Sequence, residues 1–154
     1  MYKKILVPLD GSQIAECVIP HITTIARACQ AEVELVSVIE PIDIPTRGKI
    51  ALSEDDLKAI NNEARKEAQN YLAHIAERLN RDDVRSHPVV LSGKPADSLV
   101  EYAGANDVDL IIMATHGRSG LSRWFFGSIA EKIMRAVDTP ILLVKANGCE
   151  LDAQ

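Results

Sequence analysis

The stretch VDLIIMATHGRSGLSRWFFGS, residues 108–128, decides the fold. Its first six residues are as apolar as a buried strand, and three glycines, three serines and two arginines follow within the stretch. Ligands of parallel α/β sheets bind beyond the carboxyl ends of the strands, where backbone of this kind is common. The stretch therefore favours an α/β fold with a small-molecule site at the end of this strand.

The rest of the chain alternates strands with helices. Apolar runs rich in β-branched residues predict strands at residues 3–10, 31–40, within 81–93, 109–114 and 139–146. Apolar side chains at three- and four-residue spacing predict helices after Ser12, Ser53, Lys94 and Gly127. This alternation predicts a single open, twisted, parallel five-stranded sheet with helices on both faces. Pro20 is expected to bend the first helix or to loosen one of its turns.

The helix after Ser53 has the clearest signals. Acidic residues 54–56 suit the positive end of a helix dipole. Its apolar residues share one face and are Leu57, Ile60, Ala64, Ala68, Leu72, Ile75 and Leu79.

Length and composition predict one globular domain, over residues 1–146, with a short tail at 147–154. The net charge of −5 argues against general nucleic-acid binding, which depends on neutralising phosphates. No segment has the roughly 20 consecutive apolar residues of a membrane span, and the first apolar run is too short for a signal peptide. We therefore expect a cytoplasmic protein. The three cysteines lack metal-site spacing, so no protein metal site is expected.

The glycine-rich stretch has the chemistry of a phosphate cradle. Glycines let backbone N–H groups approach an anion closely, and Gly127 and Ser128 open a helix whose first N–H groups are unpaired. Neither a Walker A loop nor the dinucleotide fingerprint G-x-G-x-x-G is present. As a bare pattern, such a loop is also typical of a sharp turn.

Three segments resemble the universal stress protein family: ILVPLDGS (5–12), DLIIMATHGRSG (109–120) and GSIAEKIMRAVDTPILLVK (127–145). The ATP-binding branch of that family carries G-x2-G-x9-G-[S/T]. Gly117, nine further residues and then Gly127-Ser128 fit this motif, whereas its first glycine falls on Ala114. The resemblance covers nearly the whole chain.

The resemblance implies a Rossmann-like sheet of the adenine nucleotide alpha hydrolase-like type, with strand order 3-2-1-4-5. It also implies that ATP, with ADP or AMP as alternatives, lies in the crevice between the first and fourth strands. Mg²⁺ carried by the phosphates is expected, and so is a homodimer that forms through the edge strand at 140–145. The matching positions imply which residues contact the nucleotide. Beside the adenosine they are Pro8 and Asp10, on adenine Val38, and on the ribose side the backbone of Met113, Ala114 and Thr115. On the phosphates they are Gly117, Gly127 and Ser128, with His116, Arg118 and Ser119 close by.

Other functions stay open from the sequence. A stress-response sensor or regulator that responds to ATP is the first hypothesis, and a nucleotide-free dimeric interaction module, supported only by Ala114, is the second. An enzyme that uses ATP on a second substrate lacks its usual signatures here, and His116 has no catalytic partner at a telling spacing. No catalytic residue is predicted, and at most slow ATP hydrolysis is expected. Asp109 is expected to be a solvated residue at the entry of its strand.

Overall fold

The computed structural model describes residues 1–42, 53–115 and 127–146, and within them the strands form one parallel sheet. The strands are β1 (Lys4–Pro8), β2 (Glu32–Ile39), β3 (Ser86–Ser92), β4 (Leu110–Thr115) and β5 (Ile141–Lys145). Their order is β3-β2-β1-β4-β5, and every neighbouring pair is parallel. The predicted fold class and strand order are confirmed.

The strand order reverses between β1 and β4. From β1 the chain builds outward through β2 to β3, and it then crosses back to β4, which pairs with β1 at Ile5–Leu110 and Leu6–Ile111. Where the connections from two neighbouring strands lead away in opposite directions, a crevice forms at the carboxyl ends of those two strands. The fold therefore places its crevice directly after Pro8 and Thr115.

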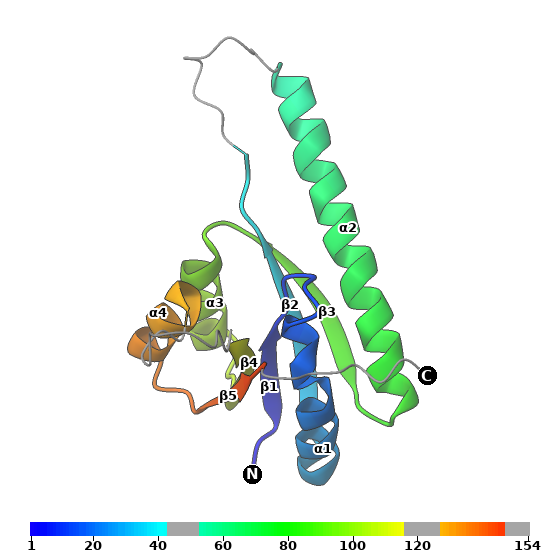
Figure 1. The fold of residues 1–154 in the computed structure, drawn as a ribbon, viewed down its shortest axis with the longest axis vertical. Coiled ribbons are helices and arrows are strands. Elements are labelled where there is room, and N and C mark those ends of the chain that lie inside the picture. Colours follow the sequence, from blue (N-terminus) through cyan, green and yellow to red (C-terminus); the bar gives the residue numbers. More distant parts are fainter. Residues whose placement is uncertain (43–52, 116–126, 147–154) are drawn as a thin grey trace.

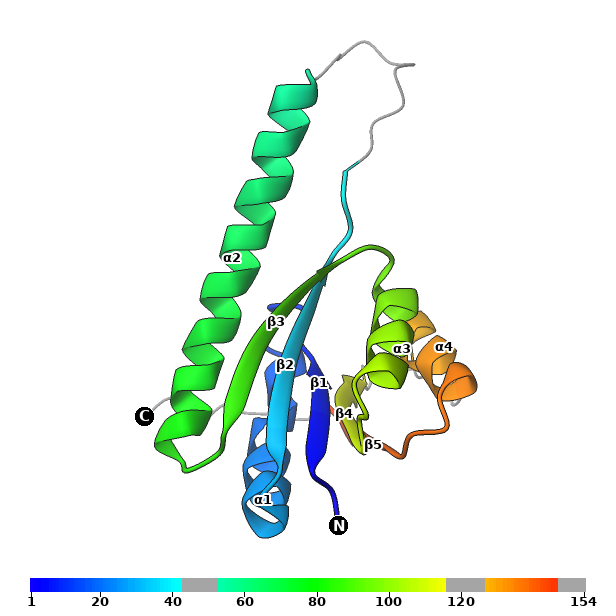
Figure 2. The same ribbon diagram turned by 180° about the vertical axis from the view of Figure 1, so that it is seen from behind.

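Helices cover both faces of the sheet (Figures 1 and 2). The short 3₁₀ helix η1 (Ala15–Val18), α1 (Ile19–Cys29) and α2 (Glu54–Arg81) pack on one face. The helices α3 (Pro95–Ala105) and α4 (Ser128–Ala136) pack on the other. Each face thus has its own hydrophobic cluster.

Pro20 divides the predicted first helix. Ser12 does start a helical segment, because its Oγ accepts the N–H of Ala15 at 3.2 Å, but only the 3₁₀ turn η1 follows. The α-helix begins afresh at Ile19, so that Pro20 lies in its first turn, where a missing N–H leaves no helical hydrogen bond unmade.

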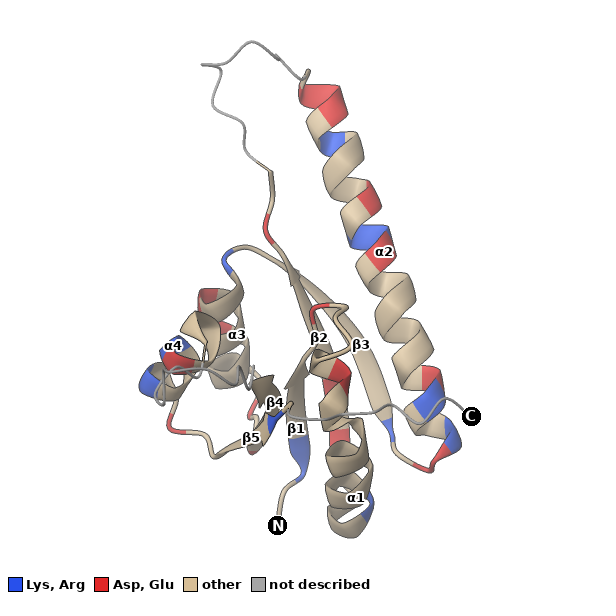
Figure 3. Ribbon diagram, viewed as in Figure 1, with Lys and Arg blue, Asp and Glu red and all other residues tan. Residues whose placement is uncertain are grey.

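The helix α2 is longer than the sheet that it covers. Its N-terminus is a capping box, in which Ser53 Oγ accepts the N–H of Asp56 and Asp56 Oδ2 accepts the N–H of Ser53, each at 3.1 Å. Only its C-terminal half is buried, and Ile60 keeps 39% of its surface exposed. The first half extends beyond the strands (Figure 1) and carries charges of both signs (Figure 3). The predicted apolar face is therefore only half covered.

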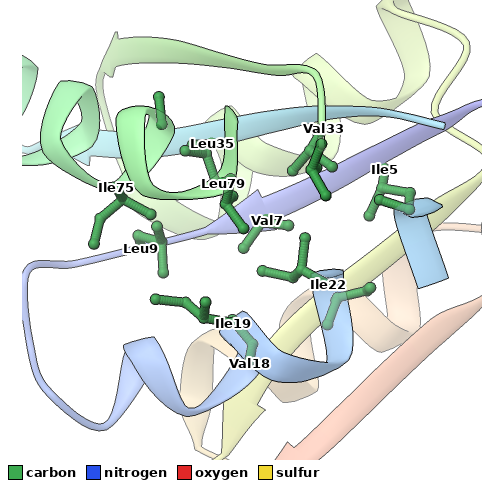
Figure 4. Packing of buried hydrophobic residues seen from close by; sticks show 14 of the residues in the cluster. Ile5, Val7, Leu9, Val18, Ile19, Ile22, Val33, Leu35, Ile75 and Leu79 are labelled. Carbon is green, nitrogen blue, oxygen red and sulfur yellow. The ribbon is translucent and has the colours of Figure 1, made fainter. Parts of the chain in front are cut away.

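The larger of the two hydrophobic clusters lies on the face that η1, α1 and α2 cover. It packs η1, α1 and the C-terminal half of α2 on β1 and β2. Side chains alternate along β1, so that Ile5 and Val7 belong to this cluster and Leu6 to the opposite one. Figure 4 shows the side chains that meet here, and its labelled residues from the helices are Val18, Ile19, Ile22, Ile75 and Leu79. All the elements that approach the crevice from this face thus share one core.

Asp109 has a structural role that the sequence did not indicate. Its Oδ2 accepts the backbone N–H groups of Lys3 and Lys4 at 2.7 and 2.9 Å. These two bonds hold the pKa of the Asp109 carboxyl below its ordinary value. Asp109 does lie at the entry of β4 and stays partly exposed, as expected, but its carboxylate also joins the entries of β4 and β1.

Within the three described ranges, no helix is both long and apolar enough to cross a bilayer.

Candidate functional site

A cavity of about 290 Å³ opens at the carboxyl ends of β1 and β4. It lies at the point where the strand order reverses, and residues from the ends of β1, β2 and β4 and from the starts of η1, α3 and α4 line it. Its volume is comparable with the about 300 Å³ of the smallest ligand pockets. The described chain therefore has a cavity of small-molecule size at the place that the topology predicts.

One wall is a polar turn between β1 and η1. Pro8, Asp10 and Ser12 line the cavity here. Asp10 Oδ1 accepts the N–H of Ser12 at 2.9 Å, and Gly11 between them has φ +82°, a conformation that favours glycine. This local hydrogen bond holds the Asp10 carboxylate at the rim of the cavity.

The interior is apolar. Val36 and Val38 of β2, Met113 and Ala114 of β4 and Leu99 of α3 line it. Apolar side chains supply most of the surface of ligand pockets, and this interior has that character.

The backbone of β2 continues past its last pair with β1 at the cavity. The carbonyl of Val36 accepts the N–H of Leu9 on the β1 side at 2.8 Å, and that of Ile39 accepts the N–H of Gly93 at 2.9 Å on the β3 side. Successive residues of a strand direct their N–H and C=O groups to opposite neighbours. The N–H and C=O of Val38 therefore face the β1 side, beyond the last pair of the two strands at Pro8–Val36.

The N-terminus of α4 forms the opposite rim. Gly127, Ser128, Ile129 and Ala130 all line the cavity. Gly127 precedes the helix with φ +88°, in the left-handed region that favours glycine, and its carbonyl accepts the N–H of Glu131 at 2.9 Å. The first N–H groups of a helix have no intrahelical partner and carry the positive end of its dipole, so this rim can bind an anion.

An ion pair fastens α3 to α4 beside the cavity. Lys132 Nζ lies 2.6 Å from Asp97 Oδ1, and this contact lowers the pKa of the Asp97 carboxyl. Both side chains are exposed, so the pair contributes little to overall stability. It does link the helix that carries Leu99 to the helix that carries Ser128.

The structure brings together most of the residues that the sequence analysis predicts for the site. Thr115 is buried in β4 and is not among the lining residues. The predicted residues that line the cavity are Pro8, Asp10, Val38, Met113, Ala114, Gly127 and Ser128. The remaining ones lie outside the described residues and are His116, Gly117, Arg118 and Ser119.

Sequence reasoning missed several lining residues, among them Ile14, Pro95, Leu99 and Ile129. Ile14 and Ile129 are large apolar residues that stay 37% and 43% exposed at the starts of helical segments. One sequence signal could have identified these lining residues: an apolar residue in the first turn of a helix that follows a parallel strand. Such turns lie at the carboxyl edge of the sheet, where the cavity is.

In the part of the chain that the structure describes, no three His, Cys, Asp or Glu side chains lie together so that they could hold a metal ion.

Comparison with known proteins gives one consistent family. A model of the universal stress protein family matches residues 1–145. Universal stress protein MJ0531 of Methanocaldococcus jannaschii is 34% identical over 148 residues, which cover 94% of this chain and 83% of that protein. Universal stress protein MJ0577 of the same organism is 30% identical and covers 94% of this chain and 96% of its own length.

Solved structures agree with this family. The structure of MJ0577 superposes with a TM-score of 0.80 over 96% of this chain and 99% of its own. A universal stress protein family structure from Arabidopsis thaliana, solved with AMP bound, has a TM-score of 0.67 and 15% identity over 99% of this chain and 97% of its own. At that identity the second likeness is one of fold alone.

Proposed function

The chain belongs to the universal stress protein family, and we propose that it binds an adenine nucleotide, ATP, in the cavity between β1 and β4. The observation that carries this proposal is a single cavity with an apolar interior and a helix N-terminus at its rim. A base and a phosphate chain need these two environments side by side. The AMP complex of the Arabidopsis protein is an instance of this fold with an adenine nucleotide, and it supports the proposal only at that level.

The base binds in the interior. The side chains of Leu99, Met113 and Val38 offer apolar surface, and the Val38 N–H and C=O face the β1 side, where the pairing with β1 has ended. Adenine presents an amino donor next to a ring-nitrogen acceptor, which complements one C=O and one N–H. Guanine presents an acceptor next to a donor at the same edge, so the same pair of groups disfavours it.

The phosphates lie at the rim formed by Gly127 and Ser128. The N–H groups of the first turn of α4 and the Ser128 hydroxyl are donors for phosphate oxygens. Mg²⁺ enters bound to the phosphates. Asp10, on the opposite rim, accepts hydrogen bonds from the ribose hydroxyls.

Ala114 is compatible with this proposal. Among the described non-glycine residues, positive φ occurs only at Gln30, Asp83 and Asp107, so Ala114 has the negative φ of an ordinary strand residue. A glycine is therefore not required there for backbone geometry. The remaining effect of the methyl group is steric, at the wall that the ligand touches.

Binding serves a regulatory role in a dimer. The strand β5 is an edge of the sheet, and the side chains of Ile141, Leu142, Leu143 and Val144 stay half-buried. An apolar edge strand is a template for pairing with another chain, and a second copy of this chain is the proposed partner. A nucleotide-free dimeric interaction module is the second candidate, which the methyl group of Ala114 in the cavity wall favours.

The nucleotide content of the purified protein separates the two candidates. The protein is isolated without added nucleotide and denatured, and the supernatant is resolved by ion-exchange chromatography. Co-purified adenine nucleotide supports the proposal. Empty protein that also fails to take up millimolar ATP supports the interaction module.

A further inference from the structure

A pair of side chains outside the cavity connects its wall to α2. Arg78 Nη1 lies 3.3 Å from Glu16 Oε2, across 62 positions of sequence. Glu16 belongs to η1, directly after the cavity residues Ile14 and Ala15, and its side chain keeps only 16% of its surface exposed. This contact joins an element of the cavity wall to the helix that packs beside it.

The ion pair lies where the cavity wall meets the hydrophobic core. Arg78 lies between Ile75 and Leu79 of α2, which are fully or almost fully buried. Directly after Glu16, Cys17 and Val18 of η1 are buried, whereas residues 10–14 of the wall before it have no buried side chain. Glu16 is therefore the point at which the exposed wall is joined to α2.

We infer that Arg78 of α2 is a positioning residue for the nucleotide site, because it holds Glu16, and with it the wall from Asp10 to Ala15, in the conformation that the ligand needs. This inference rests on the proposed function. If a ligand binds only one conformation of the wall, its apparent dissociation constant rises as the population of that conformation falls. Loosening the anchor therefore weakens binding without removing any group that touches the ligand.

The test uses the full chain and titrates wild-type, Arg78→Met and Arg78→Lys proteins with Mg-ATP by calorimetry. The matched control is Arg85→Met, which breaks the Arg85–Glu32 ion pair of 3.4 Å at the opposite end of the strands. The dissociation constant should rise at least about fivefold in Arg78→Met and less in Arg78→Lys, while the control stays within about twofold. Hydrogen exchange of the backbone amides of residues 10–18 should become faster in Arg78→Met and slow again with ATP.

The outcomes separate this inference from the proposed function. If wild-type protein does not bind ATP, both are wrong. If wild-type protein binds and folded Arg78→Met binds equally well, or if Arg85→Met weakens binding as much, the inference alone is overturned.

Discussion

Asp109 Oδ2 lies 2.7 Å from the backbone nitrogen of Lys3, although 106 positions separate the two residues. A second bond of 2.9 Å reaches the nitrogen of Lys4. Together the two bonds join the N-terminal ends of β1 and β4. They help to set the register of these strands, whose carboxyl ends line the cavity.

Replacing Asp109 by Ala should destabilise the protein by about 1 kcal/mol at pH 7, since two backbone N–H groups lose a charged acceptor at a half-exposed site. The pKa of this carboxyl is lower in the folded state than its ordinary 3.8, so its contribution is fully present above about pH 4. It is lost as the pH falls through the folded-state pKa. Urea unfolding of both proteins at several pH values measures this, and a difference that stays constant down to pH 2 would contradict it.

Ser53→Ala should loosen the first turns of α2 without much effect on global stability. The substitution removes the capping box, which is worth about 1 kcal/mol to the helix that it caps. Because the first half of α2 is not packed on the sheet, the loss stays local. Hydrogen exchange should accelerate at residues 54–60 and remain unchanged at Leu72–Leu79, whereas equal acceleration in both halves would show that α2 unfolds as one unit.

Mg-GTP should bind at least about tenfold more weakly than Mg-ATP. The Val38 N–H and C=O complement the edge of adenine and oppose that of guanine. Competition of GTP against a fluorescent ATP analogue measures the ratio, and equal affinity would mean that the base is not read by β2.

Leu143→Pro should convert the proposed dimer to a monomer. The carbonyl of Pro140 and the N–H of Ala146 bond to β4, so strand alternation directs the N–H of Leu143 to the free edge. Proline removes that donor and leaves the bonds to β4 in place. Light scattering after size-exclusion chromatography gives the mass, and a variant that stays dimeric would place the interface elsewhere.

The fold was predictable because alternation, turn signals and family motifs agree along the chain. The burial of α2 was not, because periodicity shows which side of a helix is apolar but not how much sheet lies beneath it. A helix of 28 residues is about 42 Å long, whereas the seven residues of β3 span about 23 Å. Ile60 therefore lies beyond the strands, although its spacing is that of a buried residue.

The candidate site was predictable where it follows strand ends and a family motif, as at Pro8, Asp10 and Gly127. The contributions of Leu99 and Pro95 depend on how α3 lies across the sheet beside α4, which no local pattern encodes. The role of Asp109 escaped for a similar reason, because its partners are distant in sequence.

Calorimetric titration with Mg-ATP of wild-type protein and a Gly127→Val variant tests the central claim most directly. Valine at φ +88° is strained, so the backbone must leave the conformation in which the first N–H groups of α4 line the rim that we assign to phosphate. Gly104→Ala in α3 is the control, because that position has ordinary helical geometry and open space, and the change should add about 0.5–1 kcal/mol of stability. We predict micromolar binding by the wild-type and control proteins and none by Gly127→Val; normal ATP binding by folded Gly127→Val, or no binding by wild-type protein at millimolar ATP, would contradict the account.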